Sequence, residues 1–404
     1  MTKQVFEGVK VIDFTWVGVG PITIKFLADH GATVIHIESN IQPEALRITP
    51  PFRDGIPGLN RSAYHACFNN NKYGLLFNLK HPRAKEVIKR LIDWADVVAE
   101  SFSPGTMSRW GMAYEDLVKI KPSIIMYSTC QLGQTGRRAR MAAYGTQLVS
   151  LAGFTHLTGW PDRGPTGPYG PYTDLPCPPV GAAAIAAALD YHRRTGRGVH
   201  IDLSQYETGI NFIAPVILDY TVNKRVWERE GNRCPYAAPH GIFPCKGDDR
   251  WCAIAVFTDD EWRALCKVMR NPCWTKEPRF STFLSRKKNE DELEHLLAQW
   301  TINYDAEELM YKLQKAGVPA GMLENGEDIH NDPQLIHRHY LWELNHPEIG
   351  KHSYETSPFR MSKTPAELYK AGPCLGEDTE YVCTKILGIP DELFIELLGQ
   401  GVFE

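Results

Sequence analysis

The chain has 404 residues, which exceeds the usual size of one hydrophobic core and predicts two domains. Its composition, 43% hydrophobic and 23% charged, is that of a globular protein and excludes a disordered or collagen-like chain. A formal net charge of −4 is too balanced to indicate nucleic acid as the partner. No apolar stretch approaches the ~20 residues needed to cross a bilayer, and the N-terminus lacks the apolar region of a signal peptide.

The ten cysteines are scattered and include no C-x-x-C pair. Zinc ligands normally occur in close pairs, and disulfide frameworks are rare in a chain of this size without a secretory signal. We therefore expect reduced, mostly buried thiols, no metal site, and a cytoplasmic protein without a membrane partner. The cysteines are Cys67, Cys130, Cys177, Cys234, Cys245, Cys252, Cys266, Cys273, Cys374 and Cys383.

The first predicted elements form a β-turn-α-β unit. Residues 9–14 are rich in β-branched side chains and predict a buried strand, which a glycine turn follows at Gly18–Pro21. A helix is predicted over 22–30, and a second strand over 32–37 ends at Glu38. Such a unit begins an open parallel sheet.

The same alternation of strands and helices continues to about residue 224. From there the sequence becomes rich in Pro, Cys and Trp, and we assign 225–325 to a smaller second domain. Residues 326–404 contain loops and a helix near 378–387. The further predicted strands are 74–78, 97–100, 124–128, 199–203 and 251–256, and the further helices are 82–94, 114–120, 180–194, 260–269 and 291–299.

The first glycine turn superficially resembles the dinucleotide-binding fingerprint, because Gly18 and Gly20 follow a strand and Glu38 ends the next one. The third glycine of the fingerprint is replaced by Thr23, and Pro21 stands where the backbone should approach a pyrophosphate. We therefore interpret the segment as a tight strand-to-helix turn and do not expect nicotinamide binding.

Several segments in order along the chain resemble the class III CoA-transferase family, which includes formyl-CoA and carnitine CoA-transferases. No single motif is decisive, but the ordered set covers nearly the whole chain. The matching segments are 6–13, 27–35, 69–72, 78–82, 95–105, 109–112, 133–136, 194–198, 201–204, 317–321, 331–334 and 375–379.

The resemblance implies an α/β fold with two domains. A Rossmann-like large domain with a parallel sheet would be built from 1–224, the first part of the CoA-binding domain, and from 326–404, which returns to it. A smaller α+β domain would span 225–325. Family members form interlocked dimers, so the resemblance implies a homodimer or a heteromer with a related subunit.

Asp174 matches the family's nucleophilic aspartate. An Asp in a proline-rich loop is by itself usually a solvated turn residue, but Pro171 and Pro176 restrict the backbone around this one. A carboxylate can attack a thioester to give a mixed anhydride and then an aspartyl-CoA thioester. The resemblance therefore implies transfer of CoA from an acyl-CoA to a carboxylic acid, without a metal or redox cofactor.

The resemblance also assigns a CoA site. Phe102 matches a position that lines the adenine pocket and Arg109 one that meets a CoA phosphate, although a core phenylalanine and a solvated arginine are the alternatives. The basic loop of Arg137, Arg138 and Arg140 could attract the CoA polyanion or be solvated. The remaining expected CoA-binding residues are Ser101, Thr106 and Lys72.

Three departures from the formyl-CoA transferase pattern concern the expected acyl pocket. Gly18 stands in place of a glutamine, and Gly145, after Tyr144, in place of an acidic residue. The glycine-rich flap has no counterpart, because 251–260 contains no glycine. Formyl or oxalyl transfer is therefore not expected, and Trp16, Gly18, Tyr144 and Gly145 are expected to line a pocket for a bulkier acid.

Two other functions stay open. The fold family includes α-methylacyl-CoA racemases, but their His-Asp pair aligns with Tyr144 and Gly145, which cannot replace it. The chain could instead be a non-catalytic subunit, although the retained Asp174 argues against this. The pattern is most similar to members acting on larger acids, such as benzylsuccinate CoA-transferase subunits with succinyl-CoA as donor.

Overall fold

A computed structural model of the chain describes residues 4–142 and 144–404, which form two compact units. The first unit contains the described residues up to Phe154 together with Gly167–Val226 and Gln334–Glu404. The second contains Thr155–Thr166 and Trp227–Pro333. The sequence boundaries at 225 and 325 lie close to these, but 155–166 groups with the second unit rather than with the large domain.

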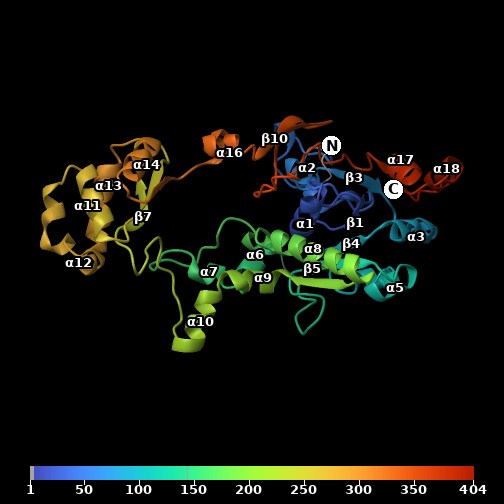
Figure 1. The fold of residues 1–404 in the computed structure, drawn as a ribbon, viewed down its shortest axis with the longest axis horizontal. Coiled ribbons are helices and arrows are strands. Elements are labelled where there is room, and N and C mark those ends of the chain that lie inside the picture. Colours follow the sequence, from blue (N-terminus) through green and yellow to red (C-terminus); the bar gives the residue numbers. More distant parts are fainter. Residues whose placement is uncertain (1–3, 143) are drawn as a thin grey trace. The chain divides into compact units, whose positions relative to one another are not determined.

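The first unit is built on a six-stranded parallel sheet with strand order β3-β2-β1-β4-β5-β6 (Figure 1). This order is that of a doubly wound nucleotide-binding fold, in agreement with the predicted Rossmann-like architecture. The strands are β1 Lys10–Phe14, β2 Thr33–Glu38, β3 Lys72–Leu76, β4 Val97–Glu100, β5 Ile125–Cys130 and β6 His200–Ser204.

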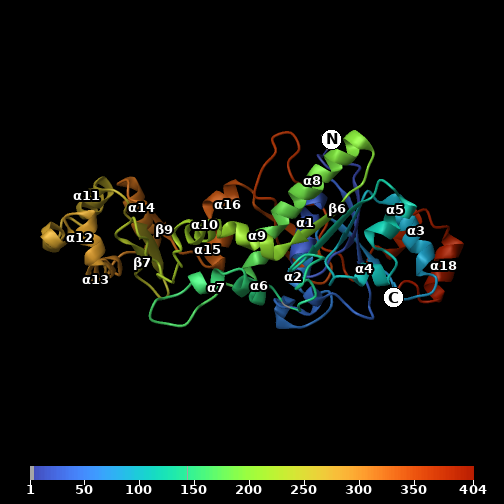
Figure 2. The same ribbon diagram turned by 90° about the horizontal axis from the view of Figure 1, so that it is seen from below.

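Both faces of this sheet are covered by helices, which explains why its strands read as continuous apolar runs. Successive side chains alternate, so that Ile12 and Val98 pack on one face while Val11 and Val97 pack on the other. Figure 2 shows α1 and α8 on one side and α3, α5 and α18 on the other. These helices are α1 Val19–Ala28, α3 Ala84–Trp94, α5 Tyr114–Ile120, α8 Cys177–Thr195 and α18 Asp391–Gly399.

The remaining helices of the first unit are short. Two of them, α9 and α10, follow β6 in succession, and α10 carries several exposed apolar side chains. A two-stranded hairpin, β10 Leu341–His346 and β11 Gly350–Glu355, also belongs to this unit. The short helices are α2 Ala63–Phe68, α4 Thr106–Arg109, α6 Gly145–Leu151, α9 Gln205–Phe212, α10 Ala214–Asn223 and α17 Thr379–Tyr381.

The C-terminal part of the chain returns to the sheet beside β3. Asp378 Oδ2 accepts a hydrogen bond of 2.8 Å from the Gly74 N–H, and the Val402 carbonyl accepts one of 2.9 Å from the Asn78 N–H. The helix predicted near 378–387 is split into α17 and a π-helical turn over Val382–Ile386, and α18, which the sequence analysis missed, follows it.

The second unit is a small α+β domain with its own core. Its antiparallel sheet has the order β7-β8-β9, and apolar side chains of α11, α13 and α14 form the core with it. α7 Phe154–Leu157 and α16 Pro333–His337 lie where the two units join in sequence. Its elements are β7 His240–Pro244, β8 Trp251–Ala255, α11 Asp259–Val268, α12 Phe283–Lys288, α13 Glu290–Thr301, α14 Ala306–Lys315, β9 Ala320–Met322 and α15 Gly326–Asn331.

Two expectations from composition can be compared with the structure. Every one of the ten cysteines is a free thiol. Within 4–142 and 144–404, no helix combines the length and the apolar character that a membrane span requires.

Candidate active site

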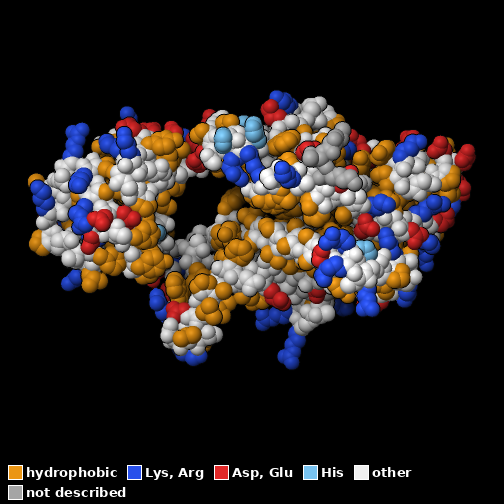
Figure 3. Space-filling view, in the orientation of Figure 1, with side chains coloured by type: hydrophobic (Ala, Val, Ile, Leu, Met, Phe, Trp, Pro, Cys, Tyr) orange, Lys and Arg blue, Asp and Glu red, His pale blue; other side chains and the backbone are white. Residues whose placement is uncertain are grey.

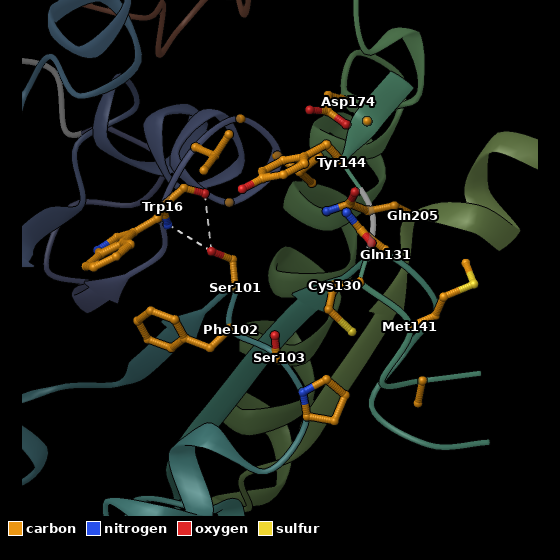
Figure 4. Close-up of a pocket in the computed structure, with 18 residues that line it drawn as sticks. Trp16, Ser101, Phe102, Ser103, Cys130, Gln131, Met141, Tyr144, Asp174 and Gln205 are labelled. Carbon is orange, nitrogen blue, oxygen red and sulfur yellow. Dashed lines mark hydrogen bonds between the residues drawn. The ribbon is translucent and has the colours of Figure 1, made fainter. Parts of the chain in front are cut away.

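A pocket with a volume of about 410 Å³ lies in the first unit at the carboxyl ends of the central strands (Figure 4). Strands β1 and β4 are neighbours at the point where the strand order reverses, so the loops that follow them separate and leave a crevice. Loops after β1, β4, β5 and β6 all contribute to the wall. The lining includes Trp16, Val17, Gly18, Ser101, Phe102, Cys130, Gln131, Tyr144, Gly145, Asp174 and Gln205.

Asp174 projects its carboxylate into this pocket. It ends a 3₁₀ turn, Tyr172–Asp174, that precedes α8, and its N–H donates a 2.8 Å hydrogen bond to the Pro171 carbonyl. Its Oδ1 is buried and has no hydrogen-bond partner in the described part of the chain. Burial raises the pKa of Asp174 to about 6. A half-buried carboxylate that lines a pocket and has a raised pKa is suited to act as a nucleophile or base.

The two glycines that depart from the family pattern lie against this carboxylate. A Cβ added at Gly18 would lie 2.9 Å from Asp174 Oδ2, and one at Gly145 would lie 3.2 Å from Oδ1. The Gly145 Cβ would also overlap the Pro171 ring. Gly18 immediately precedes α1, and Gly145 is the first residue of α6, so the carboxylate is close to two helix N-termini. The dipoles of these helices favour the ionised carboxylate and therefore oppose the effect of burial on its pKa.

Ser101 ties together the two loops that frame the pocket. Its hydroxyl accepts a 2.8 Å hydrogen bond from the Trp16 N–H and donates one of 3.2 Å to the Trp16 carbonyl (Figure 4). Phe102 then packs edge-on between Trp16 and Trp110, with ring centroids 5.5 and 5.1 Å away. The loop after β4 is thus held against the loop after β1 by polar and aromatic contacts.

The four residues expected to line an acyl pocket are brought together. Trp16, Gly18, Tyr144 and Gly145 all line the same cavity as Asp174. Tyr144 is 75% exposed, and its backbone N–H donates a 3.0 Å hydrogen bond to Gln147 Oε1 at the start of α6. Its ring therefore forms an outer, accessible wall.

A basic cavity of about 280 Å³ adjoins the pocket, because Pro104 and Ala139 line both. Arg137 and Arg140 line this second cavity. The guanidinium groups of Arg109 and Arg140 approach Gly105, where an added Cβ would lie 3.8 Å from one and 3.9 Å from the other. Thr106 Oγ1 accepts a 2.8 Å hydrogen bond from Arg109 and orients it.

Lys72 does not belong to either cavity. Its side chain is fully buried, and its ammonium donates to Asp13 Oδ2, the Pro21 carbonyl and Asn69 Oδ1 at 2.8, 3.0 and 2.8 Å. All three donors are therefore used inside the fold. We correct the expectation that Lys72 binds CoA, since residue type alone did not distinguish a solvated lysine from a buried one.

Three polar residues near the pocket were not singled out from the sequence. Gln131 and Gln205 follow β5 and β6 and line the pocket, where Figure 4 shows their amide groups close together. Glu100 ends β4, accepts a 2.7 Å hydrogen bond from the Phe102 N–H, and has its pKa raised to about 7 by burial. The sequence could have indicated these three residues, because each lies at the carboxyl end of a parallel strand and such residues gather at one edge of the sheet.

Comparison with known proteins agrees with this geometry. The profile of CoA-transferase family III matches residues 6–379. The chain is 30% identical over 396 residues to the succinyl-CoA–D-citramalate CoA-transferase of Chloroflexus aurantiacus, covering 98% of this chain and 97% of that protein. It is 34% identical to the acetyl-CoA:oxalate CoA-transferase of Acetobacter aceti, covering 84% of this chain and 86% of that protein.

A solved structure of a CaiB/BaiF family protein from Brucella suis superposes with a TM-score of 0.86 at 28% identity, covering 94% of this chain and 98% of that one. The chain therefore belongs to CoA-transferase family III and is an enzyme of that class. The predicted family and α/β fold are confirmed.

Proposed function

We propose that this enzyme transfers CoA from succinyl-CoA to a carboxylic acid and that Asp174 is its covalent nucleophile. The observation that carries the proposal is the Asp174 carboxylate, which lies in the pocket at the reversal point of the sheet with an unpartnered oxygen. Relatives named for succinyl-CoA and acetyl-CoA support the reaction class and the kind of donor.

The proposed reaction alternates between anhydrides and thioesters. Asp174 attacks the donor thioester carbonyl and CoA leaves as the thiolate, which gives an aspartyl mixed anhydride. The thiolate then attacks the aspartyl carbonyl and releases the donor acid as its carboxylate, leaving an aspartyl-CoA thioester. The acceptor carboxylate attacks that thioester, thiolate leaves again, and its attack on the acceptor's carbonyl releases acyl-CoA and free Asp174.

We assign CoA binding to the β4 side of the pocket. The Phe102 ring offers a face or edge for adenine, and Arg109, Arg137 and Arg140 would pair with phosphates in the adjoining basic cavity. Ser101 and Thr106 hold this wall in place through their contacts with Trp16 and Arg109. A CoA chain running along this wall would bring its sulfur toward Asp174.

We also assign Gln131 and Gln205 the role of the glutamine that Gly18 replaces. Both amides line the pocket that contains Asp174. Each amide group carries two N–H donors, and donors aimed at the developing oxyanion stabilise tetrahedral intermediates of acyl transfer. Tyr144 and Trp16 would then contact the body of the acyl group.

We propose that the enzyme works as a dimer, either with itself or with a related subunit. Figure 3 shows hydrophobic side chains on α10, where Ile217, Leu218 and Val222 are exposed. An apolar helix of this kind is suited to packing against another chain. The free thiols are in keeping with a reducing compartment, and we place the reaction in the cytoplasm.

The test is an exchange assay on the purified chain alone. Succinyl-CoA or acetyl-CoA is incubated with D-citramalate, oxalate or benzylsuccinate, and the acyl-CoA products are identified by mass spectrometry. We expect an acceptor-CoA to form in equal amount to the acid released from the donor. Absence of exchange with every pair would contradict catalysis by this chain alone, and deuterium uptake at the α-carbon without an acceptor would indicate a racemase.

The pH dependence of kcat/KM gives a separate prediction. Only the ionised Asp174 can attack, and burial raises its pKa to about 6, so kcat/KM should fall about tenfold per pH unit below that value. Because a phosphate monoester on the substrate also titrates near pH 6, the matched control is a dephospho-CoA thioester. If kcat/KM still falls below about pH 6 with this donor, the titrating group belongs to the enzyme. A fall that begins only near pH 4 would contradict the raised pKa of Asp174.

A further inference from the structure

Four side chains outside the pocket meet in a buried cluster in the first unit. His36 and Glu38 lie on the same face of β2, Glu44 precedes a 3₁₀ turn over Ala45–Ile48, and His65 lies on α2. Their exposed fractions are 0, 3, 0 and 2%. One nitrogen or oxygen of each lies within 4.8 Å of those of the other three.

Most of the atoms that face one another in this cluster have no hydrogen-bond partner. Among the described residues, Nε2 of His36, Nε2 of His65 and Oε2 of Glu44 are buried and unpartnered. Leaving three such atoms unsatisfied is costly, because each has lost its water on burial. The arrangement therefore calls for an additional group between them.

The distances in the cluster are somewhat longer than those around a tetrahedral metal ion. Glu44 Oε2 lies 3.3 Å from His65 Nε2 and 3.6 Å from His36 Nε2. Glu38 Oε2 lies 3.7 Å from His65 Nε2 and 3.9 Å from His36 Nε2. The two remaining pairs, His36 with His65 and Glu38 with Glu44, have ligand atoms within 4.8 Å of each other. Four ligands at the usual zinc distances of about 2.0–2.1 Å would stand roughly 3.3–3.4 Å apart, so the cluster would contract on binding.

The surrounding contacts orient the same atoms toward the centre. His36 Nδ1 lies 3.2 Å from Asp13 Oδ2, and a proton held there leaves the Nε2 lone pair directed at the cluster. Arg47 donates to both oxygens of Glu38 at 2.7 and 2.6 Å. Such carboxylate–histidine pairs and hydrogen-bonded carboxylates are typical of the outer shell of zinc sites.

We propose that His36, Glu38, Glu44 and His65 form a structural zinc site. Two imidazoles and two carboxylates supply four ligands and leave no open position, which distinguishes a structural from a catalytic site. The competing occupant is a proton on His36, whose Nδ1 lies 3.2 Å from Asp13 Oδ2 and whose Nε2 lies 3.6 Å from Glu44 Oε2. Zinc would displace that proton.

The bound ion would also brace the turn after β1. Glu44 Oε1 accepts a 2.7 Å hydrogen bond from the N–H of Val17, a non-glycine residue with φ of 70°. Val17 lines the pocket, so fixing Glu44 fixes this turn. The ion takes no part in the transfer chemistry, and the inference does not depend on the proposed function.

The test measures metal content and stability rather than activity. The full-length chain, purified from zinc-supplemented cells and passed through gel filtration, is analysed by elemental mass spectrometry. We expect about one zinc per chain, a fall in Tm on prolonged chelation, and recovery of Tm on adding zinc. Cobalt exchanged into the site should show the visible absorption of a tetrahedral ion.

Substitutions of the ligands separate this site from adventitious binding. His65→Gln and Glu44→Gln retain side-chain bulk, and each should lose the bound zinc and the response of Tm to it. The control is His346→Gln, which removes a buried histidine outside the cluster and should keep both. Wild-type chain without zinc, and without a response of Tm to zinc, would overturn the proposal even if the variants fail to fold.

Discussion

The Asp174→Asn variant is expected to lose CoA transfer almost completely, with kcat reduced at least about 10⁴-fold, as for removal of other covalent nucleophiles. The amide retains the size of the side chain but cannot form an anhydride. The measurement is the rate of acceptor-CoA formation under saturating donor and acceptor. Asp190→Asn, at a half-buried position on α8 whose carboxylate pairs with Arg193 and Arg194 and does not line the pocket, is the matched control and should retain activity.

A second readout distinguishes a nucleophile from a structural residue. Because the folded pKa of about 6 exceeds the ordinary value of 3.8, the ionised Asp174 destabilises the folded chain above pH 6. Removing that charge should therefore raise the free energy of unfolding at pH 8 by roughly 1–2 kcal/mol, with the nearby helix N-termini reducing the gain. The gain should disappear below about pH 4, where both states are protonated.

Trapping identifies the covalent species directly. Hydroxylamine added during turnover should attack the aspartyl-CoA thioester, release CoA and convert Asp174 to a hydroxamate, which mass spectrometry of its peptide would detect. Turnover at the wild-type rate by Asp174→Ala, or an unmodified peptide after trapping, would contradict the covalent mechanism.

The Gly18→Ala variant is expected to lower kcat about 100-fold while leaving the fold nearly intact. The new methyl group would lie 2.9 Å from Asp174 Oδ2, and the cheapest relief is rotation of the carboxylate away from its attacking position. Stability should fall by less than about 1 kcal/mol, since the clash involves only the end of a side chain. The donor KM should change little.

The control for this prediction is Gly399→Ala, because a Cβ at that glycine on α18 meets no atom within 4 Å. Gly18→Gln provides a second comparison. It restores the side chain that the formyl-CoA transferase pattern has at this position, but it brings the same Cβ against Asp174, so it should not rescue activity. If the Gly18→Ala variant keeps the wild-type kcat, the added methyl group does not displace the Asp174 carboxylate and the prediction is wrong.

The sequence predicted the central strands well because these strands are buried on both faces. Residues 97–100 and 10–14 are short, mainly apolar runs bounded by polar loops, and such a pattern is typical of a buried strand in a parallel sheet. Helix ends were less predictable: α8 begins at Cys177, three residues before the predicted start, because prolines fit the first turn of a helix. The helix α18 was missed altogether.

The candidate site was predicted only where family resemblance supplied a role. Asp174, Trp16 and Phe102 line one pocket, and their roles as nucleophile, acyl contact and adenine contact stay predictions. Lys72 was misassigned because burial depends on the partners that the fold supplies. The cluster of His36 and Glu38 with Glu44 and His65 was not foreseen, since Glu44 comes from a loop and His65 from α2, a short helix that the sequence analysis did not predict.

The glycines beside Asp174 also limit how this enzyme can be redesigned. The wall formed by Gly18 and Gly145 cannot accept side chains without displacing the nucleophile or the Pro171 segment. The wall that includes Met141 and Ala142 is exposed, so larger side chains there can turn toward solvent. Directed evolution toward a new acceptor should therefore concentrate its libraries on that wall and leave the glycines unchanged.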